Sequence, residues 1–182
     1  MGYIGLEWTV KAAEEERETL RRTLPEDFLD RTVSLRKYEG AEEYSRRFPG
    51  LSRWEAGESG IFAALWDMAE HYGAGLTVDL KRFPVRQETI EICEALGQNP
   101  YEISSRGCVL LAADNGNDIV WEAGVPAAFI GKVTGNRDRI LRNGEHIRYL
   151  NRPGSDGREA DKRKEFEDEE EDFSGIGEGQ QA

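Results

Sequence analysis

Apolar residues recur at helical spacing along much of the N-terminal part of the chain. From about Leu6 to Leu24 they fall every three or four positions among many charges, which predicts an amphipathic helix. Pro25 interrupts this pattern, and the two acidic residues after it favour the first turn of a second helix that extends to about Tyr38. Between residues 40 and 57 apolar and charged side chains are mixed without a clear period, so no element is predicted there.

The clearest helical pattern follows the turn Gly57-Glu58-Ser59-Gly60 and continues to about Tyr72. Strict alternation from Leu76 to Leu80 then predicts a strand with one buried face. A further helix is predicted from about Arg86 to Leu96, and Gly97 is well placed to close its C-terminal end.

The run Cys108–Ala113 has no polar member, so we expect a strand that is covered on both faces and lies at the centre of the sheet. A turn at Asp114–Asn117 leads into a short helix that reaches Glu122. After a second turn at residues 124–126, the segment Ala127–Val133 again has the composition of a strand. We expect these strands to join the one at Leu76–Leu80.

A hairpin is predicted near the end of the folded region. Strand-like residues 139–142 and 146–149 flank Asn143-Gly144, a pair that supplies the positive φ angles of a type I′ turn. Helices thus precede and separate strands that include a hairpin, so the fold class is α+β with a mixed β-sheet.

Composition and charge divide the chain into a body and a tail. The length of 182 residues fits one domain with extensions. The net charge is −12, and residues 151–182 supply half of it, with 11 acidic and 5 basic side chains (5 − 11 = −6). We expect an N-terminal helical segment at residues 1–40, an α+β domain at 41–153, and a disordered acidic tail at 154–182, with a short helix at 161–171 as the alternative.

The charge and the hydropathy exclude several partners. An acidic surface repels phosphate backbones, so nucleic acid is not an expected partner. No apolar run approaches the length of a membrane span, and the N-terminus lacks the pattern of a signal peptide, so we expect a cytoplasmic protein without membrane contact. The acidic tail is interpreted either as solubilising or as a docking segment for a basic partner.

Thiol and imidazole ligands for a metal ion are few. Cys93 and Cys108 each lie in an apolar run rather than at C-x-x-C spacing, which is typical of small core residues. His71 and His146 are the only imidazoles, so a His-based metal site and a Ser-His-Asp triad are both disfavoured. No metal site is predicted.

Three stretches, in order and at compatible spacing, carry a resemblance to a known family. They are Ile4-Gly5-Leu6-Glu7-Trp8-Thr9; Ser59–Trp66 with Phe83–Thr89 and Asn99-Pro100-Tyr101; and Ala123–Thr134. Together they make residues 2–153 similar to the C-terminal domain of the aminoimidazole ribonucleotide (AIR) synthetase-related family, in particular its hydrogenase-maturation-factor-like branch.

The resemblance implies a layered α/β/α domain that normally follows an ATP-binding domain. Family members use ATP to activate an oxygen by phosphorylation, and most of their nucleotide and Mg site belongs to that N-terminal domain. No Walker-type loop replaces it here. We therefore expect no cofactor to be bound by this chain alone, and ATP with Mg only where a separate ATP-binding half is present. The hydrogenase-maturation branch also ends in a cysteine, whereas this chain ends in Ala182, so its dehydration chemistry is not expected.

The family's helix-start motif, which resembles His-Asp-x-Thr-x-Gly-Gly, corresponds to Trp54–Gly60 of this sequence. Only Gly60 is unchanged, and Glu55 replaces one acid by another. A helix N-terminus can hold an anion, but Glu58 competes with a phosphate there. The candidate substrate- or phosphate-binding residues are Glu55, Gly57, Glu58, Ser59, Gly60, Arg86 and Ser105. The alternative is an ordinary helix cap after a flexible loop, and no catalytic residue is assigned.

Several side chains have two interpretations. Arg82, Arg86 and Arg106 form either a cationic wall for a phosphorylated ligand or an ordinary solvated surface. Family members have a longer helix between residues 115 and 124, and Trp121 is expected to fill the gap that the shorter helix leaves. Trp8 and Trp54 are either core residues or the marks of an apolar docking patch.

Three functions remain open at this point. The leading hypothesis is a non-catalytic or accessory binding domain that is catalytically incomplete alone. The second is one subunit of a split ATP-dependent enzyme, completed by a separate ATP-binding chain. The third is a pseudoenzyme that acts only as a structural module and forms a homodimer.

Overall fold

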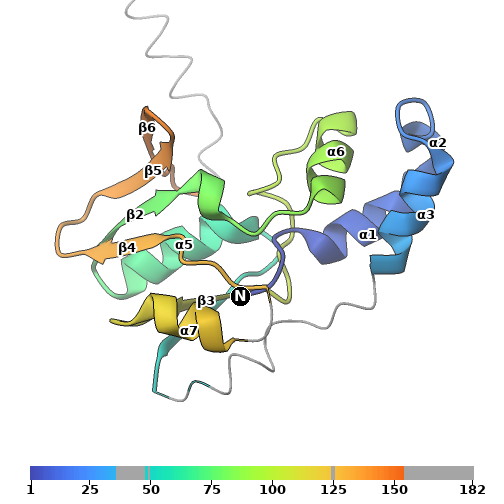
Figure 1. Ribbon diagram of the computed structural model, residues 1–182. Helices are drawn as coiled ribbons and strands as arrows, with labels where there is room; N and C mark the ends of the chain where they lie inside the picture. Colours follow the sequence, from blue (N-terminus) through green and yellow to red (C-terminus); the bar gives the residue numbers. More distant parts are fainter. Residues whose placement is uncertain (36–47, 49, 124–125, 154–182) are drawn as a thin grey trace, which may run out of the picture. The chain divides into compact units, whose positions relative to one another are not determined.

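A computed structural model describes residues 1–35, 48, 50–123 and 126–153 (Figure 1). Contacts divide the chain into one unit of residues Met1–Leu150 and another of Asn151–Ala182. The predictions for the acidic tail, for the helix end at Tyr38 and for Gly124 and Val125 lie outside the described residues.

The N-terminal part forms α1 (Leu6–Glu15), α2 (Arg17–Leu20) and α3 (Glu26–Ser34). The prediction of one continuous helix from Leu6 to Leu24 is wrong, because the backbone leaves helical geometry at Glu16 (φ −99°, ψ 18°). The break falls at the last of three consecutive glutamates, Glu14 to Glu16. It lets Leu20 pack into the same core as Leu29 of α3, and both side chains are fully buried.

A small second core joins these helices to α6 (Gln87–Ala95), and α1 packs on both α3 and α6. Its buried members are Ala12, Ala13, Leu20, Leu29 and Ile92. The prediction of a helix from about Arg86 to Leu96 is confirmed, and Gly97 ends it in the left-handed conformation (φ 63°). Trp8 packs against this core and is partly buried, so it does not mark an open apolar patch.

The larger sheet has the strand order β4-β2-β5-β6. Its strands are β2 (Gly75–Asp79), β4 (Gly131–Thr134), β5 (Arg139–Asn143) and β6 (His146–Tyr149), and the 3₁₀ turn η2 (Leu80–Arg82) follows β2. Strand β2 is antiparallel to β4 and parallel to β5, while β5 and β6 are antiparallel. The α+β class with a mixed sheet is therefore confirmed.

Helix α5 (Gly60–His71) covers one face of this sheet (Figure 1). Leu76, Val78 and Leu141 point into the core that α5 shares, as the strict alternation of β2 predicts. The guanidinium of Arg139 lies 3.9 Å from the centroid of the Trp66 ring on α5 and also pairs with Glu70. Both interactions fix the helix on the sheet.

The hairpin forms with a register different from the one predicted. Asn143 pairs with His146, so Asn143 is the last residue of β5 and the two loop residues are Gly144 and Glu145. Gly144 alone of these has a positive φ (64°), which excludes the predicted type I′ turn and fits a type II′ turn with glycine first.

Strand β3 (Val109–Ala112) pairs with β1 (Ser52–Glu55) in a separate two-stranded antiparallel sheet. The prediction that Cys108–Ala113 lies at the centre of one sheet with Leu76–Leu80 is therefore wrong, although Cys108, Val109 and Leu110 are buried as expected. Their cover comes partly from the chain start, because the Val109 amide donates to the Met1 carbonyl (2.9 Å). Burial alone does not reveal which strand is the hydrogen-bonding partner.

The segment expected to be a strand from Ala127 to Val133 becomes regular only at Gly131, where β4 begins. Helix α7 (Gly116–Glu122) forms as predicted. Trp121 is 90% exposed, so it does not fill a gap beside this helix. Ile119 is the buried residue instead, and two further positions turn a helix by about 200°, which points Trp121 to the opposite side. None of the described helices is long and apolar enough to cross a bilayer.

Candidate functional site

The candidate turn connects β1 to α5 and is held from one side by the segment around Ser105. The Ala56 amide donates to the Cys108 carbonyl (2.9 Å), and the Gly57 carbonyl accepts from the amides of Ser105 (3.0 Å) and Gly60 (3.3 Å). The sequence-predicted residues Glu55, Gly57, Glu58, Ser59 and Gly60 are thus contiguous in a well-bonded turn.

The start of α5 depends on glycine at position 60. Gly60 has φ 80°, and a Cβ there would come within 2.6 Å of the Tyr101 carbonyl oxygen. The same carbonyl accepts from the Phe62 amide (3.2 Å). Two amides of the first helical turn, those of Gly60 and Phe62, therefore donate within the protein, and Ser59 makes no side-chain cap. These two donors of the helix start therefore serve packing within the fold and are not available to an anion.

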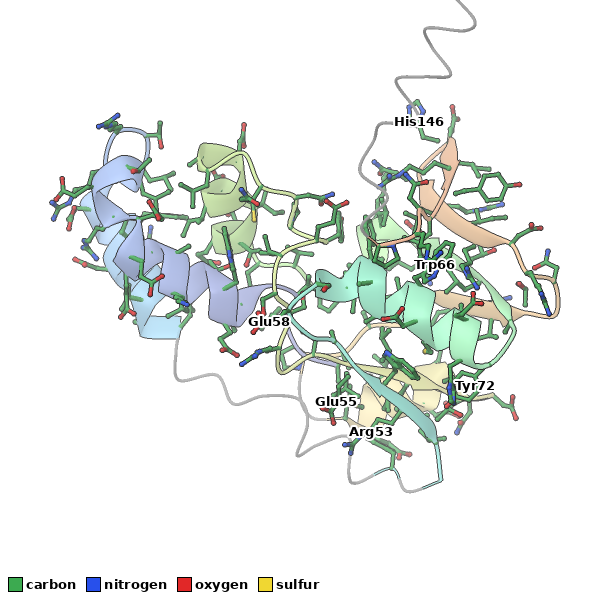
Figure 2. All side chains as sticks on the ribbon, turned by 180° about the vertical axis from the view of Figure 1, so that it is seen from behind. Arg53, Glu55, Glu58, Trp66, Tyr72 and His146 are labelled. Atoms are coloured by element: carbon green, nitrogen blue, oxygen red, sulfur yellow. The ribbon has the colours of Figure 1, made fainter. Side chains whose placement is uncertain are left out.

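Both glutamates of the turn are paired with arginine. Arg53 donates to Glu55 Oε1 (2.8 Å), and Arg106 pairs with Glu58. Figure 2 shows Arg53 and Glu55 on β1 and Glu58 near the start of α5. These pairs are largely exposed, so they contribute little to stability. They do place negative charge where a phosphate was expected.

Carboxylates engage each arginine of the expected cationic wall. Arg106 pairs with Glu58, Arg82 lies 3.6 Å from Asp79 Oδ2, and Arg86 donates to both oxygens of Glu88 (3.0 and 3.1 Å). The bidentate bond from Arg86 lowers the pKa of Glu88. Arg86 also lies 5.2 Å from the Tyr3 ring centroid. The pairing leaves no concentrated positive charge among these three side chains.

Ser105 is fully buried, and its hydroxyl donates to the Ile103 carbonyl (3.3 Å). Its amide donates to the Gly57 carbonyl (3.0 Å), and its carbonyl accepts from the Cys108 amide (3.1 Å). The residue is therefore a junction between the candidate turn and β3 rather than a polar group directed into an open cleft.

The two thiols are core residues, as the sequence predicts. Cys93 and Cys108 are buried and unpaired, and burial raises the pKa of each thiol to about 11. Cys108 Sγ also donates to the Tyr3 carbonyl (3.0 Å). Thiols with this pKa are poor nucleophiles and poor metal ligands near neutral pH.

The remaining candidate side chains are dispersed. His71 contacts the rings of Trp54 and Tyr72, with centroids 5.3 and 4.8 Å apart, so Trp54 belongs to a partly buried aromatic group rather than to a free docking patch. Within the described parts of the chain, no three His, Cys, Asp or Glu side chains gather in an arrangement suited to a metal ion. The two glutamates of the candidate turn are already paired with arginines.

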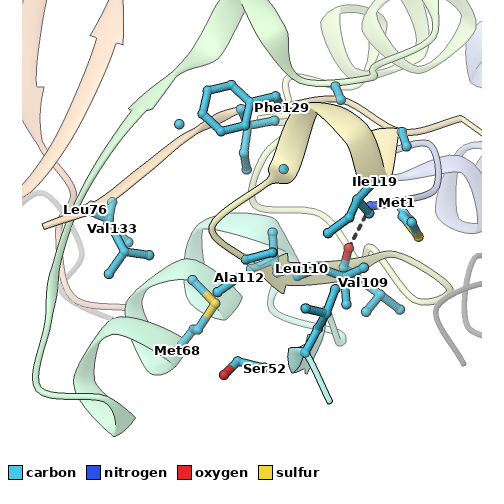
Figure 3. A pocket seen from close by; sticks show the side chains of 18 of the residues that line it. Met1, Ser52, Met68, Leu76, Val109, Leu110, Ala112, Ile119, Phe129 and Val133 are labelled. Carbon is cyan, nitrogen blue, oxygen red and sulfur yellow. Dashed lines mark hydrogen bonds between the residues drawn. The ribbon is translucent and has the colours of Figure 1, made fainter. Parts of the chain in front are cut away.

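A cavity that sequence reasoning did not predict lies elsewhere in the unit of residues Met1–Leu150. It has a volume of about 870 Å³ and is lined by residues of both sheets, of α5 and α7, and of the chain start (Figure 3). Side chains of Met68, Leu110, Ile119, Phe129 and Val133 are among its walls. No local pattern signals this cavity, because its walls come from six separate segments.

Comparison with solved structures shows how the elements are shared with other proteins. Escherichia coli HypE, a hydrogenase maturation protein, aligns with a TM-score of 0.64 and 21% identity over 85% of this chain and 49% of HypE. A chain of a HypE–HypF complex aligns with a TM-score of 0.53 and 18% sequence identity, over 62% of this chain and 40% of that chain. Thiamine monophosphate kinase (ThiL) from Aquifex aeolicus aligns with a TM-score of 0.52 and 16% sequence identity, over 78% of this chain and 50% of ThiL.

The chain has the fold of HypE and ThiL. This confirms, at the level of the fold, the resemblance to the hydrogenase-maturation-like branch of the AIR synthetase-related proteins. The chain spans only about 40 to 50% of the HypE and ThiL chains that it matches. No protein-family model and no curated protein matches the sequence.

Proposed function

We propose that this chain is an accessory domain of the AIR synthetase-related type, catalytically incomplete alone, which acts together with a separate ATP-binding chain. The observation that carries the proposal is the partial fold match, since half or more of HypE and of ThiL has no counterpart in these 182 residues. ThiL is a kinase and has been solved with AMPPCP and TMP bound. An ATP-dependent reaction is therefore the chemistry in which a domain of this fold takes part.

The candidate turn supports an accessory rather than a catalytic role. Glu55 and Glu58 are paired with Arg53 and Arg106, and the amides of Gly60 and Phe62 are used inside the fold. A phosphate approaching this turn meets two carboxylates and few free donors. The turn can border a substrate site only when another chain supplies the groups that bind the nucleotide and the metal.

The first test is phosphate release by the purified full-length chain with ATP and Mg²⁺. We expect no turnover above a no-protein control, and no heat of binding for AMPPCP in titration calorimetry. Turnover at enzyme-like rates that is lost on Glu55→Gln or Glu58→Gln would disprove the accessory role. A matched control is Glu102→Gln, which changes the same charge outside the turn.

The second test concerns the partner. A complex of HypE with HypF shows that a protein of this fold assembles with another chain, which favours a hetero-complex over a homodimer. We expect co-expression with an ATP-binding half encoded beside this chain to yield a complex. ATP-dependent turnover by that complex would favour the alternative, one subunit of a split ATP-dependent enzyme. Light scattering measures the mass of the assembly and so tests the homodimer alternative. A dimer that forms without ligand and does not bind the ATP-binding chain contradicts the proposal.

A further inference from the structure

The cavity of about 870 Å³ is separate from the candidate turn, and none of the residues Glu55 to Gly60 lines it. Its volume lies within the usual range for sites of small organic ligands. Figure 3 shows Met68, Leu110 and Ala112 on one side of the space and Leu76 and Val133 on another. Walls from several fixed elements give the cavity a defined shape.

Few charged groups line the cavity. Of the 33 lining residues, Asp114 and Lys132 carry charged side chains, and both are solvent-exposed residues. Met1 adds the N-terminal ammonium, which donates to the Val109 carbonyl (2.6 Å). Burial lowers the pKa of this ammonium, because a charge at this wall loses its hydration. The uncharged polar side chains of the lining are Ser52, Tyr72 and Asn115. The chemistry of the walls therefore selects an uncharged ligand.

The ring of Tyr72 and the aliphatic side chain of Val133, both in the lining, are only about half covered by the protein. Tyr72 at the end of α5 is 49% exposed, and Val133 of β4 is 55% exposed. Among the described residues nothing covers them further. An apolar molecule in the cavity covers these side chains and removes its own surface from water, which is the main favourable term in such binding.

The walls combine a rigid part with an adaptable part. Gly131 lies so close to β2 that a Cβ there would be 2.1 Å from the Thr77 carbonyl oxygen, so β4 is held against β2. Met68 of α5 extends a flexible thioether into the lining, and methionine adapts readily to ligands of different shape. The backbone on the β4–β2 side of the cavity is therefore fixed, while the Met68 side chain can change its conformation to fit a ligand.

We propose that this cavity is a binding site for an uncharged, largely apolar small molecule, with Ser52, Tyr72 and Asn115 available for one or two hydrogen bonds. The site goes beyond the accessory role proposed above and does not depend on it. A chain that fails to assemble with an ATP-binding partner can still bind such a ligand, and the reverse also holds.

The test uses the full-length chain and the neutral dye N-phenyl-1-naphthylamine, whose emission increases in apolar surroundings. We expect saturable binding at one site per chain. Ala112→Trp places an indole in the cavity and is expected to weaken binding at least tenfold. If circular dichroism shows that this variant is unfolded, Ala112→Phe replaces it, with a smaller loss expected.

The matched control removes apolar surface away from the cavity. Ile147→Ser with Tyr149→Ser on β6 changes two exposed apolar residues that do not line it, and binding is expected to stay unchanged. The sulfonated analogue 1-anilinonaphthalene-8-sulfonate is expected to bind at least tenfold more weakly than the neutral dye. Absence of saturation, full affinity in the filled variant, or loss of affinity in the control variant overturns the site; equal affinity for the sulfonate overturns the uncharged ligand class.

Discussion

Single residues at the candidate turn have structural tasks that their sequence positions do not reveal. Gly60 is required where the chain enters α5 against the Tyr101 carbonyl, and Ser105 joins the turn to the start of β3. Glu55 and Glu58 are engaged by neighbouring arginines. Gly60 and Ser105 of the candidate site therefore have packing and hydrogen-bonding roles in the fold.

The requirement for glycine at position 60 is testable. Gly60→Ala combines a left-handed backbone with a Cβ 2.6 Å from a carbonyl oxygen, and we expect a loss of about 2 to 4 kcal/mol in the free energy of unfolding. Gly57→Ala is the matched control, because its Cβ meets nothing within 4 Å and its φ is not positive. That variant should change stability by less than about 0.5 kcal/mol in urea denaturation. Equal effects of the two substitutions would contradict this assignment.

The buried thiols predict a pH dependence of stability. Burial raises the pKa of Cys93 and Cys108 to about 11 in the folded chain, whereas the pKa of a cysteine thiol in an unfolded chain is about 8.5. Between these values the unfolded state binds fewer protons, so stability falls as pH rises, by up to about 1.4 kcal/mol per pH unit for each thiol. Urea denaturation between pH 8 and 10 measures the slope. The variant Cys93→Ala with Cys108→Ala should flatten it, and an unchanged slope would refute the thiol origin.

Pairs of elements are joined by a few specific contacts. Helix α5 is fixed to β5 by Arg139 over Trp66, and α1 is fixed to α6 by two fully buried hydroxyls, Thr9 Oγ1 and Thr89 Oγ1, 2.9 Å apart. Thr9 also donates to the Gly5 carbonyl (2.7 Å). These contacts tie the N-terminal helices to the rest of the unit.

The α1–α6 contact leads to a prediction about coupling. Thr9→Val leaves the Thr89 hydroxyl without this partner in a buried place, and we expect a loss of about 1 to 3 kcal/mol. The double variant with Thr89→Val should cost less than the sum of the single variants, by about 1 kcal/mol, because the orphaned hydroxyl is then removed. Thr19→Val on the exposed side of α2 is the control and should be nearly neutral. Additive losses in urea denaturation would show that the hydroxyls are not coupled.

The described part of the molecule contains two cores, whose members come from residues 4 to 150. The larger core holds α5 and both sheets together, and the smaller one holds the N-terminal helices and α6. The cavity lies within the same unit. Residues 154–182 carry 11 acidic and 4 basic side chains, so the remaining chain has a net charge of −5 (−12 + 7).

A chain that ends at residue 153 should therefore keep its stability. We expect its free energy of unfolding to differ from that of the full chain by less than about 1 kcal/mol at physiological salt, because both cores are retained. Urea denaturation monitored by tryptophan fluorescence measures the difference. A loss of several kcal/mol would show that the acidic segment packs on the unit.

Local patterns predicted most of the helices and strands well. The stripe from Ile61 to Met68, the alternation in β2 and the glycine that ends α6 each depend on interactions within a few residues. Periodicity failed where distant contacts decide. The helix ends at Glu15, and Leu20 packs beside Leu29 of another helix. The hairpin pairs Asn143 with His146.

The sequence by itself determined the α+β class, the positions of its strongest elements, the buried thiols and the resemblance in fold to the hydrogenase-maturation-like branch of the AIR synthetase-related family. Tertiary structure alone decided that β3 pairs with β1, that the arginines near the turn meet carboxylates, and that six segments enclose an apolar cavity. The physical reason is range: helical and strand periodicity are properties of neighbouring residues, whereas pairing partners, ion pairs and cavities arise between residues far apart along the chain.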